Sequence, residues 1–506
     1  MIPLAANANA TALDLIAQLP ALQVMVPLLG AMICAMVRQR HIAAMIAIGC
    51  SVAMPVIALL ILWQVQATGT ISYAMGGWAP PVGIEYRIDL INAFVLLLVS
   101  LMGAAVALYA PRSLAYEISE ERQAWTYAMY LMCMSGLLGM AITGDAFNIF
   151  VFMEISSLAM YTLIAMGSER RALVAAFQYL VIGTLGATFY VIGVGLIFTV
   201  TGTLNLYDMA ALLPEIEDGH RSVIAGVAFI TIGIGLKMAM FPMHLWLPNA
   251  YAYAPTFATA FLASTATKVA VYLLLRFLFS VFGVEFTFSA TPAAEILMIL
   301  AALAMVVCSL SAIFQINIKR MLAYSSVAQV GYMLLGIALV SEAGLTGGIS
   351  HLFNHAIIKA CLFLSVGCMF YASGVTRIEN LAGMGRLMPV TTAAFVIAGL
   401  GLIGVPGTAG FVSKWFLIQG AAEAGHWWLV VVIVVSSILA VIYVGRIVEV
   451  AYFQEPNVKI VQEPGPEMVL MTWVLALAVI WFGIDTDLNA DVAGAAAREL
   501  LAGWAP

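Results

Sequence analysis

The chain has 506 residues, of which 64% are hydrophobic and only 9% are charged, and its formal net charge is −6 at pH 7. Soluble globular proteins are about 45–50% apolar and about 25% charged, so this composition excludes a single water-soluble core, and it also excludes a disordered chain. The excess of acidic over basic residues excludes a general basic surface for nucleic acid.

Long apolar runs follow one another along the chain. A bilayer core of about 30 Å needs about 20 apolar residues of helix. The sequence therefore predicts an all-α polytopic membrane protein with about fourteen transmembrane helices. We place them near residues 22–37, 42–66, 88–110, 126–143, 146–167, 172–201, 222–242, 256–282, 293–315, 320–340, 344–372, 389–421, 427–453 and 467–484.

Both ends of the chain carry weaker signals. The segment Met1 to Pro20 has no Lys or Arg, whereas a cleaved signal peptide needs a positive start, so we expect the first helix to be retained in the membrane. The segment from Asp491 to Pro506 is a candidate for a short interfacial helix.

The predicted helices 7 and 12 contain helix-breaking residues, including Pro242 in helix 7 and Pro406 in helix 12. Broken helices occur in membranes where the backbone is buried or lines a water-filled cavity. Paired interruptions indicate an internal repeat around a transport site. We therefore expect two inverted five-helix repeats. The domains become 1–125 (helices 1–3), 126–282 (helices 4–8), 293–453 (helices 9–13) and 454–506 (helix 14 and the C-terminal tail).

Basic residues indicate the orientation, because connections rich in Lys and Arg remain in the cytoplasm. Twelve of the twenty basic residues fall on alternate connections, which lie on one side. They are Arg38, Arg40, Arg112, Arg122, Arg170, Arg171, Lys319, Arg320, Arg377, Arg386, Arg446 and Lys459. We therefore expect a multi-pass protein of the cell's inner, cytoplasmic membrane with both termini outside. The even number of helices agrees with this orientation.

Five charged residues fall inside predicted spans: Glu154, Lys237, Lys268, Lys359 and Lys414. A charge at the centre of a membrane helix costs about 2.5–3.5 kcal/mol, so packing alone does not explain them. Ion pairs kept for stability are the alternative, for example Glu154 with Lys237. Four lysines against one deep acid is too unbalanced for simple pairing. The residues predict a pathway for protons or ions through the bundle.

Histidines extend the pathway. His351, His355 and Lys359 are spaced i, i+4, i+8 in predicted helix 11, so they share one face. Histidine titrates near neutral pH and can pass a proton on. A metal site is the weaker alternative, because no Glu of a zinc-protease motif intervenes. His244, in FPMHLWLP, is either a relay member or an interfacial residue.

The six cysteines lie in apolar runs without a CxxC pair, which favours buried packing residues. The sequence contains neither a Gly-rich dinucleotide loop nor an iron–sulfur or haem motif. We therefore expect no cofactor, no resident metal and no redox or hydrolytic site in this chain. The chain is expected to be an ion-transport subunit and not an enzyme.

Five stretches resemble the antiporter-like subunits shared by respiratory complex I and the Mrp-type multisubunit cation/proton antiporters. In order, they are GDAFNIFVFMEIS (144–156), FPMHLWLPNAYAYAPT (241–256), KRMLAYSSVAQVGY (319–332), HLFNHAIIKACLFL (351–364) and GVPGTAGFVSKWFL (404–417). Helices 1–3 and the tail fit the family less closely. The sequence around Glu154 and the length of fourteen helices most resemble the D-type Mrp subunit. The N-type complex I subunit is the other possibility.

The resemblance implies roles at matching positions. Glu154 and Lys237 look like the pair whose separation tunes the lysine's proton affinity, and Lys268 looks like the link from the input half-channel. The polar residues within 351–359 correspond to the connecting residues of helix 11. Lys414 corresponds to the terminal lysine of helix 12, where the M-type subunit usually has glutamate. It also implies partners: Mrp subunits of the A, B, C, E, F and G types, with protons and Na⁺ as cargo.

Two positions depart from the family's pattern, since Asn249 and Asn317 stand where relatives often carry an acid. These changes affect details of proton uptake and not the central row of charged residues, Glu154, Lys237, Lys268, Lys359 and Lys414. Two other functions remain open at the level of sequence. One is a proton-pumping subunit of complex I or a related redox-driven complex, in which partners handle the electrons. The other is a standalone solute carrier or a non-conducting scaffold.

Overall fold

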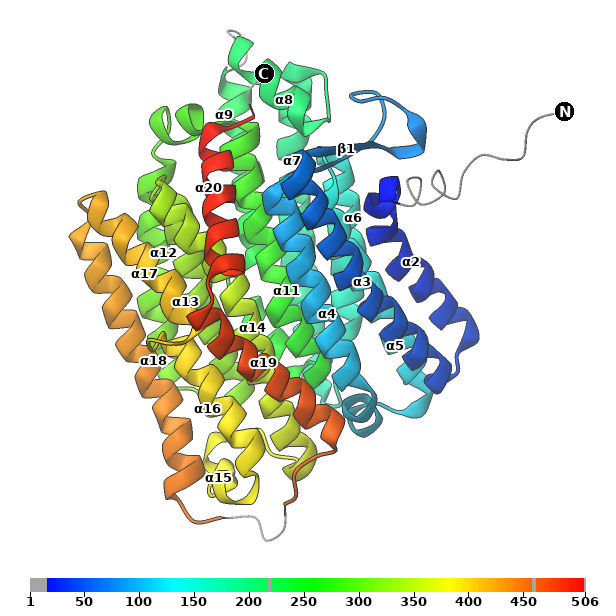
Figure 1. Cartoon of the computed structure of the whole chain (residues 1–506), viewed down its shortest axis with the longest axis vertical. Coiled ribbons are helices and arrows are strands. Elements are labelled where there is room, and N and C mark those ends of the chain that lie inside the picture. Colours follow the sequence, from blue (N-terminus) through cyan, green and yellow to red (C-terminus); the bar gives the residue numbers. More distant parts are fainter. Residues whose placement is uncertain (1–15, 217–219, 457–460, 505–506) are drawn as a thin grey trace, which may run out of the picture.

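A computed structural model describes residues 16–216, 220–456 and 461–504, and nearly all of this part is helical (Figure 1). The helices are α2 (Leu19–Val37), α3 (Arg40–Thr68), α4 (Leu90–Glu117), α5 (Glu120–Ile142), α6 (Ala146–Ala165), α7 (Arg170–Thr201), α8 (Leu206–Leu212), α9 (His220–Met238), α10 (Trp246–Tyr253), α11 (Thr256–Leu275), α12 (Ala293–Ile313), α13 (Ile318–Ala338), α14 (Glu342–Ser373), α15 (Met384–Leu387), α16 (Pro389–Ile403), α17 (Ala409–Glu423), α18 (Trp427–Phe453), α19 (Pro466–Ile484) and α20 (Val492–Ala502). The strands are β1 (Ile71–Ala74) and β2 (Glu85–Ile88).

The predicted membrane-spanning architecture is confirmed. Within the described ranges, thirteen helices are long and apolar enough to cross a membrane, and a bent pair, 378–387 with 389–403, raises the number to at most fourteen. The α2 helix begins and α20 ends at the same end of the bundle (Figure 1). We refer to this end, which also carries β1, β2 and α8, as the hairpin end.

Both predicted breaks are present. The seventh predicted helix is divided into α9 and α10, with residues 239–245 between them. The twelfth is divided into α16 and α17, with residues 404–408 between them. Gly404 has a φ of 88°, a left-handed conformation that ends α16 and that a residue with a Cβ would adopt only with strain. Lys237 lies in the last turn of α9 and Lys414 in the second turn of α17, so each break lies beside a buried lysine.

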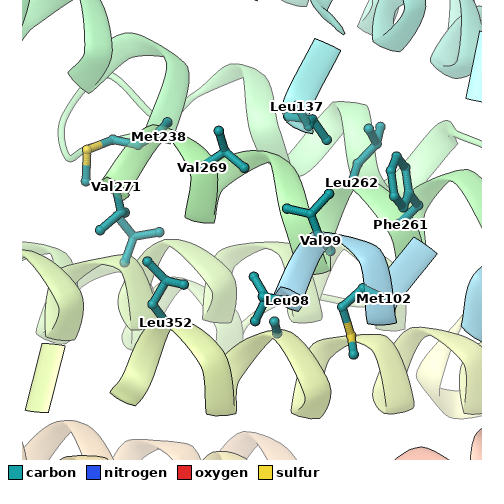
Figure 2. Packing of buried hydrophobic residues seen from close by; sticks show 14 of the residues in the cluster. Leu98, Val99, Met102, Leu137, Met238, Phe261, Leu262, Val269, Val271 and Leu352 are labelled. Atoms are coloured by element: carbon teal, nitrogen blue, oxygen red, sulfur yellow. The ribbon is translucent and has the colours of Figure 1, made fainter. Parts of the chain in front are cut away.

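Four central helices, α4, α11, α13 and α14, are largely buried within the bundle. Figure 2 shows part of this packing: Val99 of α4 points toward Leu262 of α11, and Leu98 of α4 points toward α14, on which Leu352 lies further to the left. The peripheral helices α2, α3, α18 and α19 expose large apolar side chains, such as Trp63 and Leu470. This distribution fits a bundle whose rim contacts lipid or other membrane subunits.

Sequence analysis did not anticipate two features at the hairpin end. Strands β1 and β2 form an antiparallel hairpin with Ile71 opposite Ile88, and its Tyr86 pairs with Thr143 at the start of the α6 connection. The side chain of Arg276, near the end of the predicted span 256–282, is buried in an ion pair with Asp89, with 2.7 Å between Nη1 and Oδ2. Both features depend on contacts between segments far apart in the sequence.

The C-terminal helix forms where the tail was expected to be helical, but it does not lie across the end of the bundle. It runs along the bundle beside α14 (Figure 1), and its small residues pack inward. Arg498 pairs with Glu342 at the start of α14, with 2.7 Å between nitrogen and oxygen. The division into two inverted repeats stays a prediction, although each of the two ranges contains one broken helix.

Candidate functional site

Glu154 and Lys237 lie close together inside the bundle. Glu154 is in the middle of α6, and its Oε1 is 3.8 Å from Nζ of Lys237. The ammonium is closer to a hydroxyl, since it donates to Oγ of Ser157 at 2.6 Å. Lys237 is 8% exposed, and a cavity of about 20 Å³ beside it is large enough for one water molecule. Lys237 therefore has two alternative partners within reach.

Lys268 lies in the middle of α11 and is completely buried. Its Nζ donates to the carbonyl of Ala263 and to Oγ1 of Thr267, the latter at 3.3 Å. In the described part of the chain, no carboxylate lies within ion-pair distance of it. Lys268 therefore contacts neutral oxygens and no counter-ion. A structural ion pair does not explain why a lysine is buried at this position.

The three polar residues of α14 share one face, as predicted. The rings of His351 and His355 stack with centroids 5.8 Å apart and an interplanar angle of 6°. His351 contacts Oγ of Ser413 at 2.8 Å through Nδ1 and Oε1 of Gln329 at 2.9 Å through Nε2. Neither ring nitrogen of His355 has a hydrogen-bond partner among the described residues. This histidine is therefore free to accept a proton or a water molecule.

Lys359 continues the same face one turn further along α14. Its Nζ donates to the carbonyl of Leu322 at 2.8 Å and to Oγ of Ser325 at 2.6 Å, both on α13. Like Lys268, Lys359 therefore contacts neutral oxygens, and no carboxylate of the described residues lies within ion-pair distance of it.

Lys414 lies at the break in the twelfth predicted helix. Its Nζ donates to the carbonyls of Leu402 and Ile403, at 3.1 and 2.8 Å, which the break leaves without helical partners. It also donates to Oγ of Ser437 at 3.1 Å and lies 4.8 Å from the ring centroid of Tyr332. Ser413, the residue before Lys414, contacts His351, which links this turn of α17 to the polar residues of α14.

His244 lies in the break between α9 and α10 and is 6% exposed, so the structure places it inside the bundle and not at an interface. Its Nε2 is 3.8 Å from Sγ of Cys308 on α12, and its ring is 6.2 Å from that of Tyr324 on α13. His244 thus belongs to the first predicted repeat but contacts the second. In the described ranges, no group of three or more His, Cys, Asp and Glu could hold a metal ion.

Sequence reasoning missed several neutral partners of the row. They are Ser157, Ser325, Gln329, Ser413 and Ser437. Ser157 follows Glu154 by three residues on the same helix face, which is a signal that could have identified it. The sequence analysis also placed Lys319 on a connection, whereas its side chain is 3% exposed, 3.4 Å from the carbonyl of Ala254. Lys319 lies in the first turn of α13, a helix whose residues are nearly all buried.

These features define a polytopic integral membrane protein with ionisable side chains buried between its central helices. Residues 143–440 match the family described as "NADH:quinone oxidoreductase/Mrp antiporter, TM". The chain belongs to this family of antiporter-like membrane subunits.

Relatives come from both branches of the family. The chain is 45% identical to the N-type subunit of NADH-quinone oxidoreductase from Desulforudis audaxviator over 382 residues, covering 76% of this chain and 75% of the relative. It is 30% identical to the D-type subunit of a Na⁺/H⁺ antiporter from Alkalihalophilus pseudofirmus, with 82% of each chain covered. The corresponding D-type antiporter subunit from Bacillus subtilis is 27% identical, covering 95% of this chain and 96% of the relative.

Solved structures agree with the fold. A chain of the Mrp complex from Dietzia sp. has a TM-score of 0.88 and 26% identity, covering 96% of this chain and 98% of that chain. A chain of the archaeal membrane-bound sulfane sulfur reductase has the same TM-score and coverage with 30% identity. The expected resemblance to the antiporter-like subunits is therefore confirmed, with similarity to both antiporter and respiratory assemblies.

Proposed function

We propose that the chain is the proton-translocating subunit of a multisubunit monovalent cation/proton antiporter. Protons would pass along the buried row of Glu154, Lys237, His244, Lys268, His351, His355, Lys359 and Lys414. The observation that carries this proposal is the environment of Lys268 and Lys359, which are both fully buried and contact only neutral oxygens. A buried lysine without a counter-ion exchanges its proton at a much smaller energetic cost than a paired one.

The pair Glu154 and Lys237 would start the transfer. A carboxylate beside an ammonium stabilises the charged lysine, and withdrawal of the carboxylate favours release of the proton. Nζ of Lys237 is already closer to Ser157 than to Glu154, so a small movement between these two partners changes its proton affinity. The released proton would move through Lys268 to the histidines of α14 and then to Lys414.

The cargo and the partners follow from the relatives. Similarity to D-type subunits of Na⁺/H⁺ antiporters supports Na⁺ as the exchanged cation. The resemblance to the Mrp family implies subunits of the A, B, C, E, F and G types as partners. The basic connections support a location in the cytoplasmic membrane with the hairpin end outside. This chain would supply the proton pathway and no redox or hydrolytic chemistry of its own.

The test compares Glu154→Gln and Lys237→Ala with Glu169→Gln, an exposed acid on the next connection. Antiport is measured in membrane vesicles as Na⁺-dependent dissipation of an imposed pH gradient, with assembly of each variant checked by purification of the complex. We expect the first two variants to lose antiport and the third to keep it. Normal antiport in both assembled row variants would contradict the proposal.

A second candidate is the proton-pumping membrane subunit of a redox-driven complex, which the 45% identity to an N-type subunit favours. In this case the same row would be driven by electron transfer in partner subunits. Purification of the tagged chain in mild detergent, followed by mass spectrometry, separates the two. Flavin- or iron–sulfur-bearing partners, and transport that requires an electron donor, would select the redox-driven complex.

A further inference from the structure

The row reaches Lys414, but the cavity beside Lys414 does not lead to water through polar groups. This cavity, of about 250 Å³, lies between α17 and α18. Apart from Lys414 and Ser437, its side chains are apolar, and Trp415, Ile438 and Val441 expose large apolar surfaces at its rim. A proton that leaves through this cavity would arrive at the apolar side of the bundle. A connection from the row to water therefore has to pass through polar groups elsewhere.

Such a connection begins at His351 and leads toward the hairpin end. Its partner Ser413 lies one turn beyond Ala409, the first residue of α17, on the same face of that helix. The carbonyl of Ala409 accepts a hydrogen bond of 2.8 Å from Nδ2 of Asn354 on α14. Asn354 also donates to Ser350 at 3.2 Å. The break in the twelfth helix is therefore bordered by polar groups of α14 on the side away from the apolar cavity.

Asn354 then meets a residue of the segment between α19 and α20. Asn489, in the turn between α19 and α20, donates to Oδ1 of Asn354 at 2.9 Å and to the carbonyl of Phe482 at 2.8 Å. Both asparagines are 0% exposed. In the described part of the chain, Oδ1 of Asn489 accepts no hydrogen bond. A buried acceptor without a partner costs about 1–3 kcal/mol unless water satisfies it, so this position favours a water molecule.

The turn that holds Asn489 lies deep in the bundle. In Figure 1, α19 ends about halfway along the bundle and α20 continues to the hairpin end. Gly483, next to the end of α19, packs against the backbone of Thr408 in the break. Asp487 and Asp491, on either side of Asn489, are exposed at this level. Carboxylates at membrane depth are costly when they face lipid, so we expect water beside these two side chains.

We propose that the corner between α19 and α20 is the outlet through which the row exchanges protons with water at the hairpin end. Protons pass from His351 by Ser413 and water held at Asn354 and Asn489 to the water beside Asp487 and Asp491. Asn354 and Asn489 hold the water and carry no proton themselves. This outlet rests on the proposed function, because it gives the same row its connection to the aqueous phase.

Accessibility from water tests the outlet without any transport measurement. Asn489→Cys is treated, from the side of the hairpin end, with a membrane-impermeant cationic methanethiosulfonate reagent. Val82→Cys, 87% exposed in the hairpin connection, marks that side, and Ser309→Cys, 0% exposed on α12, is the buried control. The chain with only its six native cysteines gives the background. We expect Asn489→Cys to react severalfold faster than Ser309→Cys, and faster with a cationic than with an anionic reagent. Equal rates for Asn489→Cys and Ser309→Cys would overturn the outlet.

Transport separates the outlet from a structural role of the amide pair. We expect Asn489→Leu to lower antiport severalfold, Asn489→Ser to retain most of it, and the double change Asp487→Asn and Asp491→Asn to lower it at high pH. Asp208→Asn, an acid at the same end but on α8, should have no effect. If Asn489→Cys is labelled and Glu154→Gln keeps normal antiport, the proposed function is contradicted, but the access of water to Asn489 stands. Unlabelled Asn489→Cys with inactive Glu154→Gln would contradict only the outlet.

Discussion

Nζ of Lys237 lies 2.6 Å from Oγ of Ser157 and 3.8 Å from Oε1 of Glu154, so the serine hydroxyl is its nearer partner. Among the described residues, Lys237 is the only lysine of the row with a carboxylate within ion-pair distance. The serine competes with Glu154 for the ammonium. It therefore holds the ion pair partly open in the resting protein.

Ser157→Ala removes this competition. Lys237 is then expected to pair more closely with Glu154 and to hold its proton more tightly, because an opposite charge favours the charged form. A group that binds its proton more tightly releases it only at higher pH, so the pH optimum of antiport should shift upward. The measurement is the antiport rate in vesicles as a function of pH.

Ser156→Ala is the matched control. Ser156 and Ser157 are both buried, and both donate to the carbonyl of Met153, at 3.0 and 2.6 Å respectively. Only Ser157 contacts Lys237. An equal shift in both variants, or no shift in Ser157→Ala, would show that the hydroxyl does not set the pairing of Lys237.

The two histidines of α14 should separate stability from transport. His351→Leu leaves Oε1 of Gln329 without its buried partner, which costs about 1–3 kcal/mol, while Ser413 can still donate to the carbonyl of Gly410. His355→Leu removes no hydrogen bond among the described residues. We expect both variants to lose antiport, but only His351→Leu to lower the thermal stability of the purified protein. Full antiport in a stable His355→Leu protein would remove this residue from the pathway.

The close contact of α16 with α17 predicts a strong effect of Gly410→Ala. A Cβ at Gly410 would collide with the carbonyl oxygen of Gly401, so α17 must move away from α16. Overpacking of this kind costs about 1–3 kcal/mol, and it would withdraw Lys414 from the carbonyls at the break. We expect lower stability and lower antiport. Gly445→Ala on α18, where a Cβ meets open space, is the control and should change neither.

The buried pair of Asp89 and Arg276 predicts a structural and not a functional effect. Arg276 also donates to Asn92 at 2.6 Å and to Ser280 at 3.0 Å, so it is fully engaged. Asp89→Ala leaves this guanidinium buried without its counter-ion and should destabilise the protein by about 3–5 kcal/mol. Glu120→Ala, which breaks the exposed pair with Arg40, should cost at most about 1 kcal/mol. Thermal unfolding in detergent measures both, and similar losses would contradict the difference in burial.

The sequence alone determined the type and the approximate number of the membrane-spanning elements. Runs of about 20 apolar residues leave no other solution than membrane helices, because the backbone must satisfy its own hydrogen bonds in lipid. Pro242 and Pro406 located the breaks. The spacing of His351, His355 and Lys359 fixed their common face, since helical geometry depends only on separation along the chain.

Only the tertiary structure decided which neutral groups meet the row. Ser157 reaches Lys237 across 80 positions of sequence, and Asn489 reaches Asn354 across 135. The hairpin of β1 and β2, the burial of Arg276 and the path of α20 along α14 also come from such contacts. Apart from the spacing of Ser157 and Glu154, nothing in the local sequence of these serines and asparagines marks the ones that lie near a buried charge. Their role arises from packing, which places a hydroxyl or an amide within hydrogen-bond distance of a buried ion.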